Sequence, residues 1–169
     1  MMNIDVNNDK EYANIVSHIL NNEEFSKIKD IEHHGTTRYL HSLRVSYYSY
    51  KISKALHLSY DETARAGLLH DFFLSKENRS LFDRFISTFT HPKKAVEHTS
   101  EFFDITEKEE DIIKAHMFPF YVSMPKYAES WIVNSVDKVV GAFEFSKTFT
   151  YKFSYATNLA LIFLINIIK

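Results

Sequence analysis

The sequence predicts an all-α fold, and three observations indicate it. Only three glycines and three prolines occur among 169 residues, which leaves little turn chemistry for a protein built of sheets. Apolar residues recur at helical spacing along the chain, and two stretches of capping-box form precede such segments. With 45% apolar and 25% charged residues, the composition is that of a globular chain. We expect about six or seven helices.

The chain length suits one domain with an appended helix. Residues 36–145 form the predicted domain, and residues 1–35 a helical extension before it. Residues 146–169 form a predicted apolar helix that packs on the domain or on a partner, such as a second copy in a homodimer. Within the extension we expect one helix from Asp9 to about Leu20 and a short helical piece over 23–30.

The next predicted helix begins at Thr36 or Thr37 and runs to about Leu58. Its best apolar stripe follows the spacing i, i+4, i+7, i+11, i+14 and i+15. The stripe consists of His41, Val45, Tyr48, Ile52, Ala55 and Leu56. His41 is therefore expected on the buried face of this helix.

A further helix is predicted to begin at "SYDE", with Ser59 as N-cap and Glu62 completing a capping box. It contains "TARAGLLHDFF", whose small residues permit a close approach to a neighbouring helix. His70 and Asp71 fall at its C-terminal end. Residues 75–90 are then expected to form a loop and a short helix.

Two helices are predicted in the next part of the chain. The first begins with Thr90 as cap and Pro92 in its first turn, where the missing N–H costs nothing. The second begins at another capping box, formed by Thr106 and Glu109, and reaches His116.

After the irregular segment "FPFYVSMP", a helix from Glu129 to about Glu144 is expected, with Asp137 among inward-facing valines. The later run "LALIFLINII" has about ten apolar residues, half of what a membrane span needs, so no span is expected. The N-terminus is polar and acidic and lacks the features of a secretory signal. These features favour a cytoplasmic protein.

The net charge and the absence of cysteine exclude some partners and some kinds of metal site. A formal charge of −2 provides no general attraction to phosphate backbones, so nucleic acid is not an expected partner. Because the chain has no cysteine, any metal must be held by His, Asp or Glu.

Several titratable residues fall on apolar helix faces or at helix ends. Taken singly, each is more often a hydrogen-bonded core residue than a ligand. Buried carboxylates at Asp71 and Asp137 nevertheless need cationic or donor partners, and a shared metal would satisfy the whole group. The group consists of His41, His70, Asp71, His91, His116 and Asp137.

Four of these residues lie in the segments "RYLHSLRVS", "AGLLHDFF" and "IVNSVDKVV". Their order and sequence context resemble the HD-domain superfamily of metal-dependent phosphohydrolases. The similarity covers about residues 36–145. It implies an all-helical core in which these four residues bind a divalent metal. They are His41, His70, Asp71 and Asp137.

Some members of the superfamily carry two more histidines and bind two ions. His91 and His116 stand where those would fall, with His98 as a competitor of His91, and Asp71 would be the bridging ligand. The bacterial HD hydrolases of symmetrical dinucleoside tetraphosphates show a similar order, whereas the HD-GYP phosphodiesterases differ by a "GYP" segment that this chain lacks. The expected cofactor is one or two ions of Fe, Mn, Zn, Ni or Co.

The predicted activity is hydrolysis of a phosphoester or phosphoanhydride in a small phosphorylated metabolite, a nucleotide or dinucleotide, by a metal-bound hydroxide. Asp71, Lys138 and Arg44 are the predicted catalytic residues, and Arg38, Arg44 and Lys76 the predicted substrate contacts. Two alternatives remain at this point. One is a non-catalytic HD-like module that binds a nucleotide or protein, and the other is a helical interaction module with ordinary polar core residues.

Overall fold

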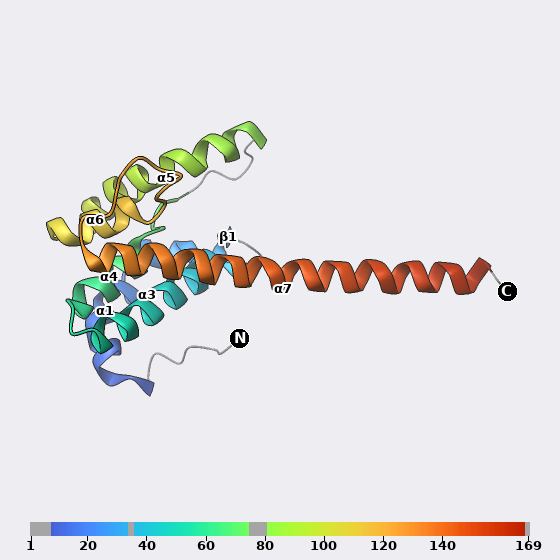
Figure 1. The fold of residues 1–169 in the computed structure, drawn as a ribbon, viewed down its shortest axis with the longest axis horizontal. Coiled ribbons are helices and arrows are strands. Elements are labelled where there is room, and N and C mark those ends of the chain that lie inside the picture. Colours follow the sequence, from blue (N-terminus) through green and yellow to red (C-terminus); the bar gives the residue numbers. More distant parts are fainter. Residues whose placement is uncertain (1–7, 34–35, 75–80, 168–169) are drawn as a thin grey trace.

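The computed structural model describes residues 8–33, 36–74 and 81–167 (Figure 1). The elements, in chain order, are α1 (Lys10–Leu20), α2 (Glu23–Ser26), the 3₁₀ helix η2 (Lys27–Asp30), β1 (Glu32–His33), β2 (Thr36–Thr37), α3 (Arg38–Ala55), α4 (Tyr60–Leu69), α5 (Leu81–Phe102), α6 (Glu107–Ala115) and α7 (Ala128–Ile167). The predicted all-α class is confirmed. In the described part of the chain, sheet structure is limited to β1 and β2, two-residue strands that pair antiparallel on either side of residues 34–35.

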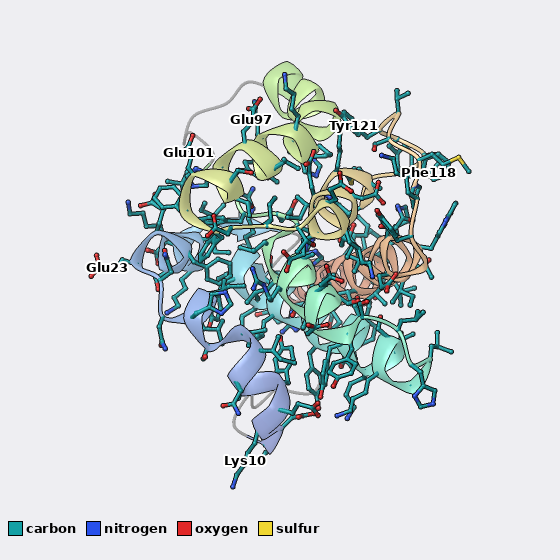
Figure 2. The ribbon with its side chains drawn as sticks, turned by 90° about the vertical axis from the view of Figure 1, so that its left-hand side faces the viewer. Lys10, Glu23, Glu97, Glu101, Phe118 and Tyr121 are labelled. Carbon is teal, nitrogen blue, oxygen red and sulfur yellow. The ribbon has the colours of Figure 1, made fainter. Side chains whose placement is uncertain are left out.

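The helices α3, α4 and α7 form the middle of the molecule. α3 packs on both α4 and α7, while α6 bridges α4 and α7 and also carries α5 (Figure 1). Buried apolar residues from α1 to α7 make one continuous core, and charged side chains such as Lys10, Glu23 and Glu97 point outward at the rim (Figure 2). This arrangement brings the start of α3, the ends of α4 and α6, and the first half of α7 to one place.

The buried face of α3 differs from the predicted stripe. His41 and Val45 are buried, but Ile52 and Leu56 are 41% and 58% exposed, so the second half of that stripe is wrong. The helix also ends earlier than predicted, at Ala55. The face that packs instead carries four fully buried serines, Ser42, Ser46, Ser49 and Ser53.

Close packing explains why serines are buried there. A Cβ on Gly67 of α4 would lie only 3.0 Å from the Cα of Ser46. Ser46 also donates from Oγ to the carbonyl of Ala64 and accepts from the hydroxyl of Tyr12. Small side chains therefore set the α3–α4 distance, and a pattern of large apolar residues could not reveal this face.

The two predicted capping boxes have different outcomes. Thr106 and Glu109 form theirs at the start of α6, as predicted. The Ser59 side chain makes no capping hydrogen bond, because its Oγ accepts from Lys108 instead. The backbone N–H of Ser59 donates to Glu129 of α7, so α4 is capped by a residue distant in sequence.

The start of α5 was wrongly predicted. The helix is continuous from Leu81, so Thr90 is no cap, and Pro92 lies in the helix interior rather than in the first turn. An interior proline costs roughly 3 kcal/mol through its missing N–H and its ring. Burial of the apolar side chains of Pro92 and Ala95 acts in the opposite, stabilising direction.

The last helix is longer than predicted. α7 runs without a break from Ala128 to Ile167, where a helix ending near Glu144 and a separate C-terminal helix were expected. In Figure 1 it extends well past the other helices, and Phe145, Phe149 and Phe153 are exposed. Packing of residues 146–169 on a partner stays a prediction. In the described residues no helix has both the length and the apolar character needed to cross a membrane.

Candidate metal centre

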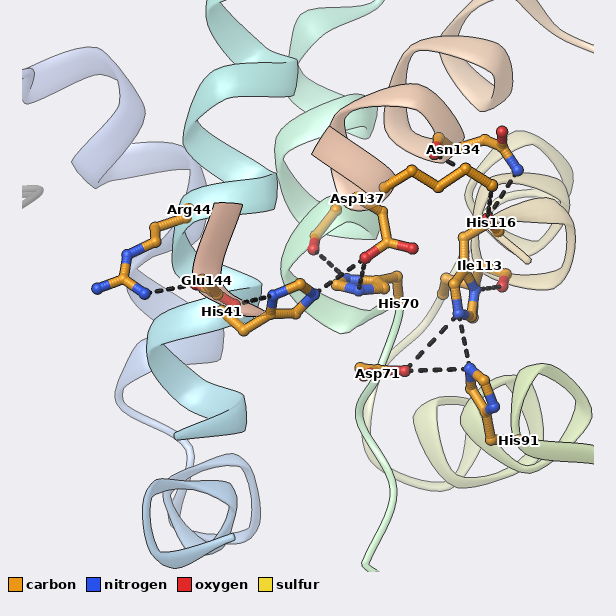
Figure 3. A network of polar contacts seen from close by, with 12 residues as sticks. His41, Arg44, His70, Asp71, His91, Ile113, His116, Asn134, Asp137 and Glu144 are labelled. Carbon is orange, nitrogen blue, oxygen red and sulfur yellow. Dashed lines mark hydrogen bonds and ion pairs between the residues drawn. The ribbon is translucent and has the colours of Figure 1, made fainter. Parts of the chain in front are cut away.

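Side chains from five helical segments converge between α3 and α7 (Figure 3). His41 lies in the first turn of α3, His70 caps the end of α4, and Asp71 follows it. His116 caps the end of α6. Together with His91 of α5 and Asp137 of α7, these are the six residues predicted as ligands, and three overlapping groups of three lie within 4.8 Å. The groups are His41–His70–Asp71, His70–His116–Asp137 and Asp71–His91–His116.

One half of the cluster is built around Asp137. Its Oδ1 lies 3.0 Å from Nε2 of His41 and 3.5 Å from Nε2 of His70. His70 is fully buried, and its Nε2 has no hydrogen-bond partner within the described residues. A buried ring nitrogen of this kind is costly unless something else binds it.

The other half is built around Asp71. The Nε2 atoms of His91 and His116 are 3.0 Å apart, and Oδ1 of Asp71 lies 3.5 Å and 3.7 Å from them. With bonds of 2.0–2.1 Å, the ligands of a tetrahedral metal ion lie about 3.3 Å from one another. The separations in both halves therefore have the size that a shared ion requires.

Hydrogen bonds at Nδ1 decide which nitrogen each ring presents. Nδ1 of His70 donates to the Gly67 carbonyl at 2.8 Å, and Nδ1 of His116 donates to the Ile113 carbonyl at 2.6 Å. A carbonyl can only accept, so Nδ1 carries the proton and a lone pair remains on Nε2 when the ring is neutral. This is the usual arrangement of metal-binding histidines.

The third ring, His41, is held at both nitrogens by α7. Its Nε2 contacts Asp137, and its Nδ1 lies 2.8 Å from Oε2 of Glu144, whose Oε1 accepts from Arg44 at 2.5 Å. Figure 3 shows His41 clamped between these two carboxylates.

The surroundings fix the charges in the metal-free state. Burial, reinforced by the nearby His70 and His91, lowers the pKa of His116 to about 3, so this ring is neutral. Burial also lowers the pKa of His41, but hydrogen bonds to Asp137 and Glu144 outweigh it and raise that pKa to about 10. Burial raises the pKa of the Asp137 carboxyl, yet the His41 contact holds it well below its ordinary value.

The donor set fits a divalent metal. It consists of imidazole nitrogens and carboxylate oxygens, which suit Zn, Fe, Mn, Co or Ni rather than a soft metal. Within the described residues, Nε2 of His70 makes no hydrogen bond and lies 3.5 Å from Oδ1 of Asp137, and the neutral His116 ring keeps its Nε2 lone pair. Without a metal, protonated His41 is the cation that faces Asp137.

Comparison with known families decides the assignment. The sequence model of the HD domain family matches residues 38–141, well over half of the chain and all six clustered residues. The protein belongs to the HD domain family. Neither the curated proteins nor the solved structures include a match to this chain.

One residue that supports the HD centre was not predicted. The Nδ2 amide of Asn134 donates to the carbonyls of Ala115, His116 and Phe118. Asn134 therefore fixes the turn after α6 and with it the backbone of His116. Its position one turn before Asp137 was the available signal, since both face inward on α7.

The structure separates His91 from its competitor His98. His91 points into the HD centre, whereas the ring of His98 packs on Phe72 and Phe102, with ring centroids 4.6 Å and 5.1 Å away. Two turns of α5 separate them, and among the described residues the group of potential metal ligands around Asp71 includes His91 but not His98.

The predicted cationic residues have different partners around the HD centre. Arg38 is buried, donates to the Phe73 carbonyl at 2.5 Å and stacks on the Phe73 ring. Arg44 pairs with Glu144. Lys138 lies beside the HD centre and donates to the carbonyls of His116 and Asn134. The fourth predicted cation, Lys76, lies outside the described residues.

Proposed function

We propose that this HD domain is a metal-dependent phosphohydrolase that cleaves a phosphoester or phosphoanhydride of a small phosphorylated metabolite, a nucleotide or dinucleotide. The observation that carries the proposal is the buried cluster in which Asp71 joins two ligand groups, His41–His70–Asp71 and Asp71–His91–His116. Because the two groups share one carboxylate, they could together hold two neighbouring ions, and pairs of metal ions are widely used for phosphoryl transfer.

In this proposal, His41, His70, Asp71 and Asp137 would hold one ion, and His91, His116 and the shared Asp71 would hold a second. When bound, such ions supply Lewis acidity, which polarises a phosphoryl oxygen and makes water a better nucleophile at neutral pH. The chain keeps the rings oriented through their Nδ1 hydrogen bonds, so no reorganisation is needed when substrate arrives.

Lys138 is the proposed cation for the negative charge of the phosphoryl group. Its ammonium has three donors, of which the carbonyls of His116 and Asn134 use two. Its Nζ lies 3.1 Å from the carbonyl of His116, so its third donor is available to an anion at the centre. Arg38 contacts Phe73 and Arg44 pairs with Glu144, and their predicted roles toward substrate stay predictions.

A nucleotide is favoured by the aromatic loop that follows His116. Phe120 is 63% exposed in this loop, whereas Phe118 packs edge-on against Trp131. An exposed aromatic ring one short loop away from a phosphate-binding centre suits stacking on a base.

The direct test measures hydrolysis by metal-reconstituted protein of a generic phosphodiester, nucleoside triphosphates and a symmetrical dinucleoside tetraphosphate. Asp71→Ala should abolish turnover, because it removes the ligand that both groups share. His98→Gln on α5 is the control and should retain activity. Unchanged turnover in Asp71→Ala would refute the proposal, and metal-loaded protein that binds nucleotides without hydrolysing any would favour a non-catalytic module.

A further inference from the structure

Glu144 is a buried carboxylate of α7 that no sequence pattern indicated as a site residue. It lies on α7 two turns after Asp137, so both side chains lie on the same face of the helix. Only 3% of Glu144 is exposed. It also lies three residues beyond the segment that matches the HD domain family.

Both oxygens of Glu144 have defined partners. Oε2 lies 2.8 Å from Nδ1 of His41, and Oε1 accepts from Nη1 of Arg44 at 2.5 Å. The same Arg44 nitrogen also donates to Oγ1 of Thr36 at 3.3 Å. Arg44 thus fixes the carboxylate, and the carboxylate fixes the ring.

The position of His41 in its helix explains why it needs this partner. His70 and His116 cap the ends of α4 and α6, and each takes the carbonyl three residues before it, which has no partner within the helix. His41 lies in the first turn of α3, where the carbonyls are bonded along the helix. An acceptor for its Nδ1 must therefore come from another element.

We infer that Glu144 is a positioning residue of the metal centre: it keeps the proton of His41 on Nδ1 and directs Nε2 toward the metal. The inference rests on the metal centre of the proposed function. A carboxylate partner also makes the ring a stronger ligand than a carbonyl does, so loss of Glu144 should weaken metal binding roughly 10- to 100-fold.

Glu144 could instead have a purely structural role, because its ion pair with Arg44 connects α7 to α3. That tie alone would change stability without changing the tautomer or the metal affinity. Glu129 is another buried carboxylate of α7, but it pairs with Lys108 and the Ser59 N–H instead of His41. It therefore provides a matched control.

The experiment is Co²⁺ titration of the full chain, followed by its visible absorption bands, for the wild type, Glu144→Ala, Glu144→Gln and Glu129→Gln. We expect a roughly 10- to 100-fold weaker Kd for Glu144→Ala, an intermediate value for Glu144→Gln, whose amide oxygen still accepts from Nδ1, and no change for Glu129→Gln. Equal affinities in all four proteins would overturn the inference.

Nitrogen NMR of ¹⁵N-histidine-labelled, Zn²⁺-loaded wild type tests the same point without a mutant that must fold. We expect His41 to carry its proton on Nδ1 and to bind Zn²⁺ through Nε2. Zn²⁺ ligation through Nδ1 of His41, or no ligation of His41, would overturn the inference. If the other proposed ligands still bind Zn²⁺ in that case, the proposed function is unaffected. Wild type that binds neither Co²⁺ nor Zn²⁺ would overturn both.

Discussion

His41 and His116 are both buried imidazoles, yet their pKa values move in opposite directions. Two carboxylates contact His41 and raise its pKa to about 10, whereas burial beside other histidines lowers that of His116 to about 3. In the metal-free protein, His116 therefore accepts at Nε2, and His91 is the donor across their 3.0 Å contact.

The raised pKa of His41 predicts how the stability of the metal-free protein depends on pH. A folded-state pKa above the ordinary 6.5 means that the stabilisation is complete below about pH 6.5 and is lost as pH rises toward about 10. We therefore expect wild type to have a higher free energy of unfolding than His41→Gln in urea with chelator, and this difference should shrink between about pH 6.5 and pH 10. A constant difference would contradict the protonated His41.

The residues of the centre were largely predictable from the sequence, and its supporting residues were not. An Asp among valines at position 137 and an adjacent His70–Asp71 pair break apolar patterns, which makes them visible. Glu144 and Asn134 act through hydrogen bonds to residues far along the chain, His41 and the turn after α6, and such pairings exist only in the folded molecule.

Between elements, the contact of α3 and α4 depends on small residues. Because a Cβ at position 67 would lie 3.0 Å from the Ser46 Cα, Gly67→Ala should destabilise the protein by about 1–3 kcal/mol. Gly141 of α7 is the matched control, since a Cβ there meets nothing within 4 Å, and Gly141→Ala should stabilise by roughly 0.5–1 kcal/mol. Thermal unfolding of both variants measures this, and equal effects would refute the close packing.

Helix positions followed from the sequence better than helix ends and faces did. The Thr106 cap is local, because Glu109 lies three residues away, and it was predicted. The Ser59 cap failed because Lys108 and Glu129, from other helices, compete for that residue. The serine face of α3 was missed because close packing, rather than apolar character, buries it.

Across the whole molecule, the centre exists only when five helical segments are folded together. The proposed ligands span residues 41 to 137, so metal binding would be coupled to folding, and bound metal should stabilise the entire domain. The continuous α7 links the centre, through Asp137, to the exposed phenylalanines of its distal half. Contact of these residues with a second copy of the chain stays a prediction.

Elemental analysis of protein purified without an affinity tag tests whether His41, His70, Asp71, His91, His116 and Asp137 hold metal. We expect about two equivalents per chain after reconstitution for the wild type, about one for His91→Gln, and almost none for Asp71→Ala, because Asp71 is shared. His98→Gln should match the wild type. Wild-type protein that holds no metal after gentle purification and reconstitution would show that these residues do not form a metal centre.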